Sequence, residues 1–235
     1  MVIGLVLLIA FGLWAAVKKD QSVVPLRLFT HLNFSASMVG LFFAGVATNG
    51  PMLLLPLFFQ NLRGESVAIA GLSMLPQGIE MLLARPVVGN LIDRIGARFV
   101  TLGGLAITLI GAIPFIYFDQ TTNFWLLMAV LFVRGIGAGA ILSPLMTDAF
   151  IGADKQFSGQ VSIATRTMQN VGGAFGSAML ATIVVNYQNQ HVHTLMAIAH
   201  SYQQGFLWAV IFTVVLMLPA LGLTNKLSKK VSVNA

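Results

Sequence analysis

The fold is decided by one polar stretch, Gly89-Asn90-Leu91-Ile92-Asp93-Arg94-Ile95-Gly96-Ala97-Arg98, which joins two long apolar runs. These runs cover about residues 66–89 and 99–118. A helix crosses a bilayer with roughly 20 apolar residues, so each run is long enough. The stretch therefore predicts a tight loop at residues 90–98 between two membrane-spanning helices, and Gly96 suits the sharp change of direction.

The composition is typical of a polytopic membrane protein. Hydrophobic residues make up 57% of the chain and charged residues 9%, whereas soluble domains carry about 25% charged residues. The mean hydropathy is +0.87. The net charge of +6 resides mostly in short loops, which indicates membrane topology rather than nucleic-acid binding. Without cysteine, the chain has no disulfides, iron–sulfur clusters or cysteine-based metal sites.

Seven apolar segments are long enough to be expected as membrane helices. The first is followed, not preceded, by basic residues, which indicates a stop-transfer helix rather than a signal peptide. The segments cover about residues 1–17, 30–59, 66–89, 99–118, 124–150, 159–185 and 204–224. The loops between them are expected at residues 18–29, 60–65, 90–98, 119–123, 151–158 and 186–203.

Basic residues orient these helices, because Lys and Arg concentrate on the cytoplasmic side. One set of alternate loops has only Arg63. The other set and the C-terminal tail are therefore expected in the cytoplasm. Their basic residues are Lys18, Lys19, Arg27, Arg94, Arg98, Lys155, Lys226, Lys229 and Lys230.

Seven spans with a cytoplasmic C-terminus would place the N-terminus outside, although no translocated domain precedes it. We therefore expect that an N-terminal portion is missing. Residues 1–29 are predicted to be a leftover transmembrane helix with a cytoplasmic connector. Residues 30–226 are predicted to form a six-helix transporter domain, and residues 227–235 a cytoplasmic tail.

The polar stretch resembles the cytoplasmic signature of the major facilitator superfamily, Gly-x-x-x-Asp-Arg-x-Gly-Arg-Arg. The matching residues are Gly89, Asp93, Arg94, Gly96 and Arg98, with Ala97 in place of one Arg. Further stretches are similar to the C-terminal half of the superfamily's 14-helix drug–proton antiporters. They are residues 24–29, 71–78, 134–139, 143–145 and 166–176.

The resemblance implies an all-α membrane protein: the six-helix C-terminal half of a facilitator fold, plus one preceding helix. It implies proton-coupled efflux of small hydrophobic or cationic compounds across a bacterial inner membrane. The proton is the coupling ion, no other cofactor is expected, and the partner is the missing N-terminal half. The other classes considered are a seven-helix receptor and an intramembrane hydrolase. The last span lacks a Lys that could form a Schiff base with retinal, which argues against a seven-helix retinal protein. No Gly-x-Ser-x-Gly motif occurs, which argues against the hydrolase.

Four charged residues fall within predicted spans: Glu80, Arg134, Asp148 and Arg166. Charges at membrane depth usually face the bundle interior or a water-filled path. Burial disfavours a charged carboxyl group, so Glu80 is either a proton carrier or a packed, neutral side chain. The resemblance implies that Arg134 acts in proton coupling or holds helices together. Asp148 is expected as a helix-end charge or a gate contact.

Polar and small residues recur along the span at residues 159–185. Arg166, Asn170, Gly173 and Ser177 are spaced by four, three and four residues, which places them on one helix face. This face is predicted to pack closely on another helix or to line a cavity.

Two further features concern helix geometry. Asn49-Gly50-Pro51, followed by Pro56, predicts either a helix break that lines the cavity or a plain kink, because proline leaves backbone carbonyls without donors. The resemblance implies that Asp93 acts in gating by contacting a neighbouring helix end, where a carboxylate is favoured at an N-terminus. The other reading is a loop that only sets topology.

Overall fold

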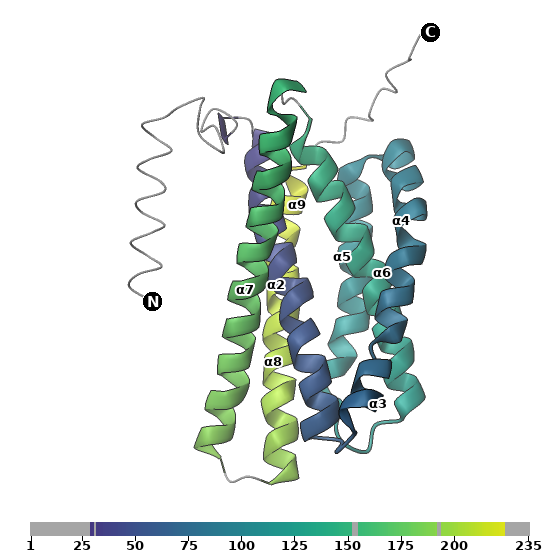
Figure 1. Cartoon of the computed structure of the whole chain (residues 1–235), viewed down its shortest axis with the longest axis vertical. Coiled ribbons are helices and arrows are strands. Elements are labelled where there is room, and N and C mark those ends of the chain that lie inside the picture. The colour runs from purple at the N-terminus through teal and green to yellow at the C-terminus, as the bar shows by residue number, and fades with distance from the viewer. Residues whose placement is uncertain (1–28, 31, 152–154, 192–193, 224–235) are drawn as a thin grey trace.

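The computed structural model describes residues 29–30, 32–151, 155–191 and 194–223. The predicted helix at residues 1–17, its connector and the tail lie outside this range. Every regular element within it is helical, which confirms the predicted all-α fold (Figure 1). The elements are α2 (Leu32–Asn61), α3 (Val67–Leu72), α4 (Leu75–Ile95), α5 (Ala97–Ala112), η3 (Ile113–Ile116), α6 (Phe124–Ala149), η4 (Lys155–Phe157), α7 (Ser158–Gln190), α8 (Leu195–Val215) and α9 (Met217–Leu221).

The long helices run along one axis as a bundle (Figure 1). The most extensive packing is of α2 on α7 and of α5 on α6, with α4 also on α6. By contrast, α6 and α7 touch little. We call the end where α4 meets α5 the Gly96 end, and the opposite end the Arg63 end.

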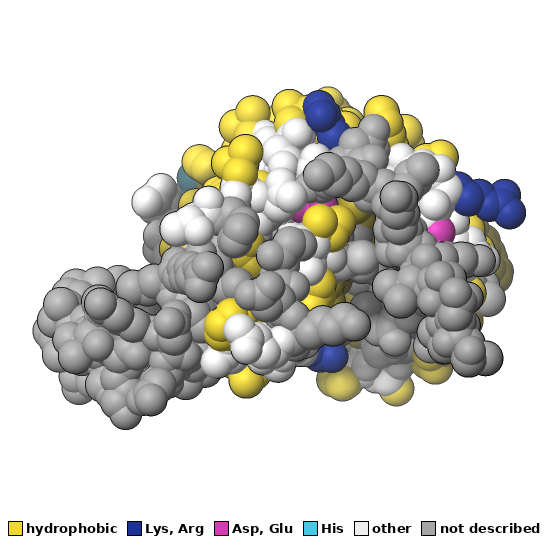
Figure 2. All heavy atoms as spheres, turned by 90° about the horizontal axis from the view of Figure 1, so that it is seen from above, with side chains coloured by type: hydrophobic (Ala, Val, Ile, Leu, Met, Phe, Trp, Pro, Cys, Tyr) yellow, Lys and Arg dark blue, Asp and Glu magenta, His cyan; other side chains and the backbone are white. Residues whose placement is uncertain are grey.

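Within the described residues, five helices are long and apolar enough to cross a membrane. They are α2, α5 with η3, α6, α7, and α8 with α9. The 21 residues of α4 are sufficient in length, but this helix also carries charged residues and is less apolar. Seen from the Gly96 end, hydrophobic side chains form much of the described rim (Figure 2), as expected for a surface that contacts lipid.

The loop predicted at residues 90–98 is wrong. Residues 90–95 continue α4, and α5 begins at Ala97, so the turn is confined to Gly96. Its backbone has φ +88°, a conformation that glycine adopts readily. Leu91, Ile92 and Ile95 extend the apolar run, and residues 90–95 contain neither glycine nor proline.

Two other predicted boundaries also differ. The segment at residues 66–89 is broken after α3, and α4 starts again with Pro76 in its first turn. Proline lacks the N–H that would continue the preceding helix but fits a first turn. The loop predicted at residues 186–203 is mostly helical: α7 extends to Gln190, and Thr194 caps the start of α8 by accepting a hydrogen bond from the Ala197 amide.

The Arg63 end is tied by polar contacts. Arg63 pairs with Glu65 at 3.0 Å and donates to the carbonyl oxygen of Thr122 at 2.7 Å. This links the α2–α3 turn to the turn before α6. In that second turn, hydrogen bonds from Thr121, with a smaller effect from Thr122, lower the pKa of the partly exposed Asp119 carboxyl.

Glycines bring α2 and α7 into close contact. A Cβ atom on Gly172 would meet the backbone of Phe42, and one on Gly176 would meet Val46. On α2, a Cβ on Gly45 would meet the backbone of Gln169. Small residues at such positions let membrane helices approach closely, so this pair forms a closely packed wall of the bundle.

Candidate functional site

A groove lies where α6 and α7 touch little. It consists of two adjoining hollows, of about 110 and 480 Å³. Both are lined by Gly139, Leu142 and Gln169, which makes them neighbours. The smaller hollow also has walls from α2 and α4, and the larger one continues between α6 and α7 toward the Gly96 end.

Glu80 lies in the smaller hollow, near the middle of the stretch formed by α3 and α4. It is only 1% exposed, and neither carboxylate oxygen has a hydrogen-bond partner among the described residues. The carboxylate lies against Gly135, where any Cβ atom would overlap it. Because Gly135 has no side chain, it leaves the space in which the Glu80 carboxyl resides. A buried carboxyl without hydrogen-bond donors has a large desolvation cost when it is charged.

Arg134 lies beside this carboxyl, and its charge interacts with that of Glu80. No direct ion pair joins them within the described structure; instead, Arg134 Nη2 donates to the carbonyl oxygen of Ala47 at 3.1 Å. Ala47 precedes Pro51 by four residues, so its carbonyl receives no helical N–H. The guanidinium thus satisfies the backbone group that the proline leaves free.

The break predicted at Asn49-Gly50-Pro51 is therefore wrong, because α2 is one helix of 30 residues that contains both Pro51 and Pro56. Asn49 nevertheless lines the smaller hollow. Gly50 faces Leu180 and the backbone of Gly176 on α7. Contacts from α6 and α7 hold α2 in helical form across this region.

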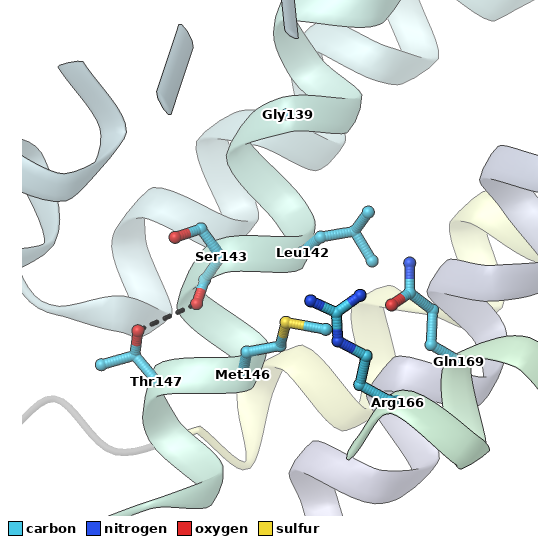
Figure 3. A pocket seen from close by; sticks show the side chains of 7 residues that line it. All are labelled: Gly139, Leu142, Ser143, Met146, Thr147, Arg166 and Gln169. Atoms are coloured by element: carbon cyan, nitrogen blue, oxygen red, sulfur yellow. Dashed lines mark hydrogen bonds between the residues drawn. The ribbon is translucent and has the colours of Figure 1, made fainter. Parts of the chain in front are cut away.

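Arg166 reaches into the larger hollow from α7 (Figure 3). Its guanidinium extends toward Met146 and Leu142 of α6, with the Gln169 carboxamide beside it. Arg166 is exposed, and the structure records no hydrogen bond or ion pair for it with the described residues. On the opposite wall, the Thr147 hydroxyl donates to the Ser143 carbonyl at 3.0 Å.

The predicted stripe on α7 divides into two parts. Asn170 is exposed, whereas Gly173 packs against the Asn49 side chain. Ser177 donates to the Asn49 carbonyl at 3.3 Å. The stripe therefore combines both predicted uses: its Arg166 end lines a cavity, and its Ser177 end packs on α2.

The remaining predicted residues lie apart from the groove. Asp148 is fully buried near the Gly96 end of α6 and accepts a hydrogen bond from Ser37 of α2 at 3.2 Å. Asp93 and Arg94 are exposed on the last turn of α4. Gly89 is also exposed, and Arg98 is partly exposed in the first turn of α5.

Sequence reasoning missed several polar groups of the site. Gln77, Thr48 and Gln169 line the groove, and the Ala47 carbonyl holds Arg134. Gln77 and Gln169 were visible as polar residues within apolar spans, which is a usable signal. The Ala47 carbonyl could be anticipated only by counting four residues back from Pro51.

The groove lies among packed helices of membrane-spanning length, with buried charged residues at its inner end, which is the architecture of a helical membrane protein. Residues 1–177 match the Major Facilitator Superfamily. Because this match covers most of the chain, the protein belongs to that superfamily.

Individual relatives are more distant. The chain is 26% identical over 208 residues to the uncharacterized MFS-type transporter YhcA of Bacillus subtilis, covering 88% of this chain and 39% of YhcA. It is 26% identical to multidrug resistance protein Stp of Mycobacterium tuberculosis, with coverages of 74% and 32%. It is 28% identical to the riboflavin transporter RibZ of Clostridioides difficile, with coverages of 77% and 40%. The chain thus spans less than half the length of these relatives.

Proposed function

We propose that the chain acts as one half of a proton-coupled exporter of small hydrophobic compounds. The observation that carries this proposal is the Glu80 carboxyl, which is buried in the groove, has no hydrogen-bond donor among the described residues and is electrostatically coupled to Arg134. Such a group can exchange a proton with the groove. Relatives named as multidrug and lincomycin resistance proteins support the substrate class.

In this mechanism, Glu80 binds and releases the coupling proton. The charged carboxylate attracts the Arg134 guanidinium, which at the same time holds the Ala47 carbonyl of α2. Protonation removes that attraction and leaves the guanidinium with its backbone partner alone. The state of Glu80 therefore changes the balance of forces on Arg134, which connects α6 to α2.

The groove is open on one side, and we propose that a second six-helix half closes it. Transporter sites commonly lie between two such repeats near the membrane midplane. The length of the relatives supports this proposal, because each contains more than twice the aligned region. We also propose that the Gly96 end faces the cytoplasm in a bacterial inner membrane, since the basic residues concentrate there.

The test is substrate-induced proton movement in vesicles that contain the chain together with its complementary half. Addition of a transported compound should collapse an imposed pH gradient, as reported by a pH-sensitive dye. Substituting Glu80→Gln should abolish this collapse but leave downhill substrate movement. Transport that is independent of the pH gradient in the unsubstituted protein would contradict proton coupling.

A further inference from the structure

We propose that the larger hollow binds the anionic group of an amphipathic ligand, a carboxylate or phosphate, through Arg166 and Gln169. This inference deepens the proposed function, on which it rests, by assigning the chemical class of the compound that enters the groove. It also separates this groove from one built for simple cationic drugs.

The first argument is the geometry of the donors. The Arg166 guanidinium extends into a hollow of about 480 Å³ and has no protein partner among the described residues (Figure 3). Gln169, one turn further along α7, lines the same hollow and has amide donors to offer. A guanidinium binds carboxylate and phosphate oxygens with paired N–H groups, which makes these groups its best ligands.

The second argument is the charge balance of the groove. Arg134, the cation beside Glu80, is buried and donates to the Ala47 carbonyl, so its guanidinium already has a protein partner. The nearest acid on the α6 wall, Asp148, is fully buried and accepts a hydrogen bond from Ser37 of α2. Arg166 is therefore the uncompensated charge among the described residues that line the groove, and its field attracts anions.

The third argument is the opposite wall. Leu142 and Met146 present apolar side chains across from the guanidinium, while Ser143 and Thr147 add hydroxyl groups. Methionine is a flexible side chain that adapts to irregular apolar ligands. An anionic head at Arg166 with a hydrophobic body along α6 matches this distribution, whereas a fully polar anion would leave the apolar wall unused.

The experiment is equilibrium binding to the full 235-residue chain in nanodiscs of phosphatidylcholine, a lipid with no net charge. Two fluorescent probes share one aromatic body: pyrenebutyrate, which carries a carboxylate, and the neutral pyrenebutanol. We expect the chain to bind the carboxylate probe about tenfold more tightly than the alcohol, as a charge-assisted contact would give. Arg166→Gln should remove this preference, and Arg166→Lys should retain part of it.

Both variants replace an exposed side chain, so the helix should fold as before, and unchanged thermal unfolding checks this. Equal binding of the two probes by the unsubstituted chain, or an undiminished preference in Arg166→Gln, would overturn the proposal. Repeating the titration in phosphatidylglycerol nanodiscs distinguishes the sources of the anion. A lipid phosphate that occupies the site should weaken pyrenebutyrate binding, while a site reserved for soluble acids should keep its affinity. The measurement requires no transport, so its failure is separable from failure of proton-coupled efflux.

Discussion

Arg134 completes a helix that Pro51 leaves incomplete. The proline has no N–H for the Ala47 carbonyl, and the Arg134 guanidinium from α6 donates to that oxygen at 3.1 Å. In a membrane, no bulk water can replace a missing backbone partner. The proline and the arginine therefore belong to one structural unit, although 83 positions separate them in the numbering.

This relationship predicts energetic coupling between the two residues. Arg134→Met should be less destabilising when Pro51 has been replaced by Ala, because alanine restores the helical N–H. We expect a coupling of about 1.5–3 kcal/mol, typical of a hydrogen bond with a charged donor. Thermal unfolding of the single and double variants in detergent measures it.

Pro56→Ala is the matched control for that cycle. Pro56 lies on the same helix and frees the carbonyl of Met52, an exposed residue, whereas the Arg134 guanidinium donates to Ala47. The costs of Pro56→Ala and Arg134→Met should simply add. Equal coupling of Arg134 to both prolines would show that the effect arises from helix propensity alone.

A second prediction concerns the space that Gly135 leaves for Glu80. Gly135→Ala should force the carboxylate to move, at a cost of about 1–3 kcal/mol. Gly103→Ala on α5 should be neutral or stabilising, because no atom lies within 4 Å of its added Cβ. Unfolding temperatures compare the two. The cost of Gly135→Ala should largely disappear in a Glu80→Ala background. If the cost persisted there, the destabilisation would not arise from a clash with the Glu80 carboxylate.

A third prediction concerns orientation. The chain has no native cysteine, so single cysteines at the exposed positions Asn90 and Thr121 can be labelled selectively. These positions lie at the Gly96 and Arg63 ends. A membrane-impermeant maleimide added to intact cells should label Thr121→Cys and leave Asn90→Cys unlabelled. Labelling of both positions from outside would contradict the proposed topology.

A fourth prediction concerns Asp93, which is exposed on the last turn of α4. Asp93→Asn should lower transport by the assembled protein without reducing its amount in the membrane, because insertion depends on apolar length and basic residues. Quantitative blotting of membranes measures the amount of inserted protein, and vesicle assays measure transport. If transport is unchanged, the role of Asp93 in gating is contradicted and the motif only sets the membrane orientation.

The helical class and most spans could be predicted from the sequence, because a helix that crosses the lipid bilayer requires a long run of apolar residues. The boundaries were harder. Apolar residues on both sides of Gly96 allowed α4 to continue to Ile95, so a polar motif that looked like a loop is mostly helix. The sequence similarly suggested a break at Pro51, but a proline shows only which carbonyl loses its donor.

The sequence by itself determined that this is a polytopic helical membrane protein with charged residues at membrane depth. These properties depend on the local run of side chains. Only the tertiary structure decided what those charges meet: Glu80 beside Gly135, Arg134 on the Ala47 carbonyl, and Arg166 in an open hollow. Each contact joins helices distant in sequence, and close packing of small residues sets which side chains face one another. The surroundings of these charged side chains depend on how the helices pack, and a local sequence pattern does not specify that packing.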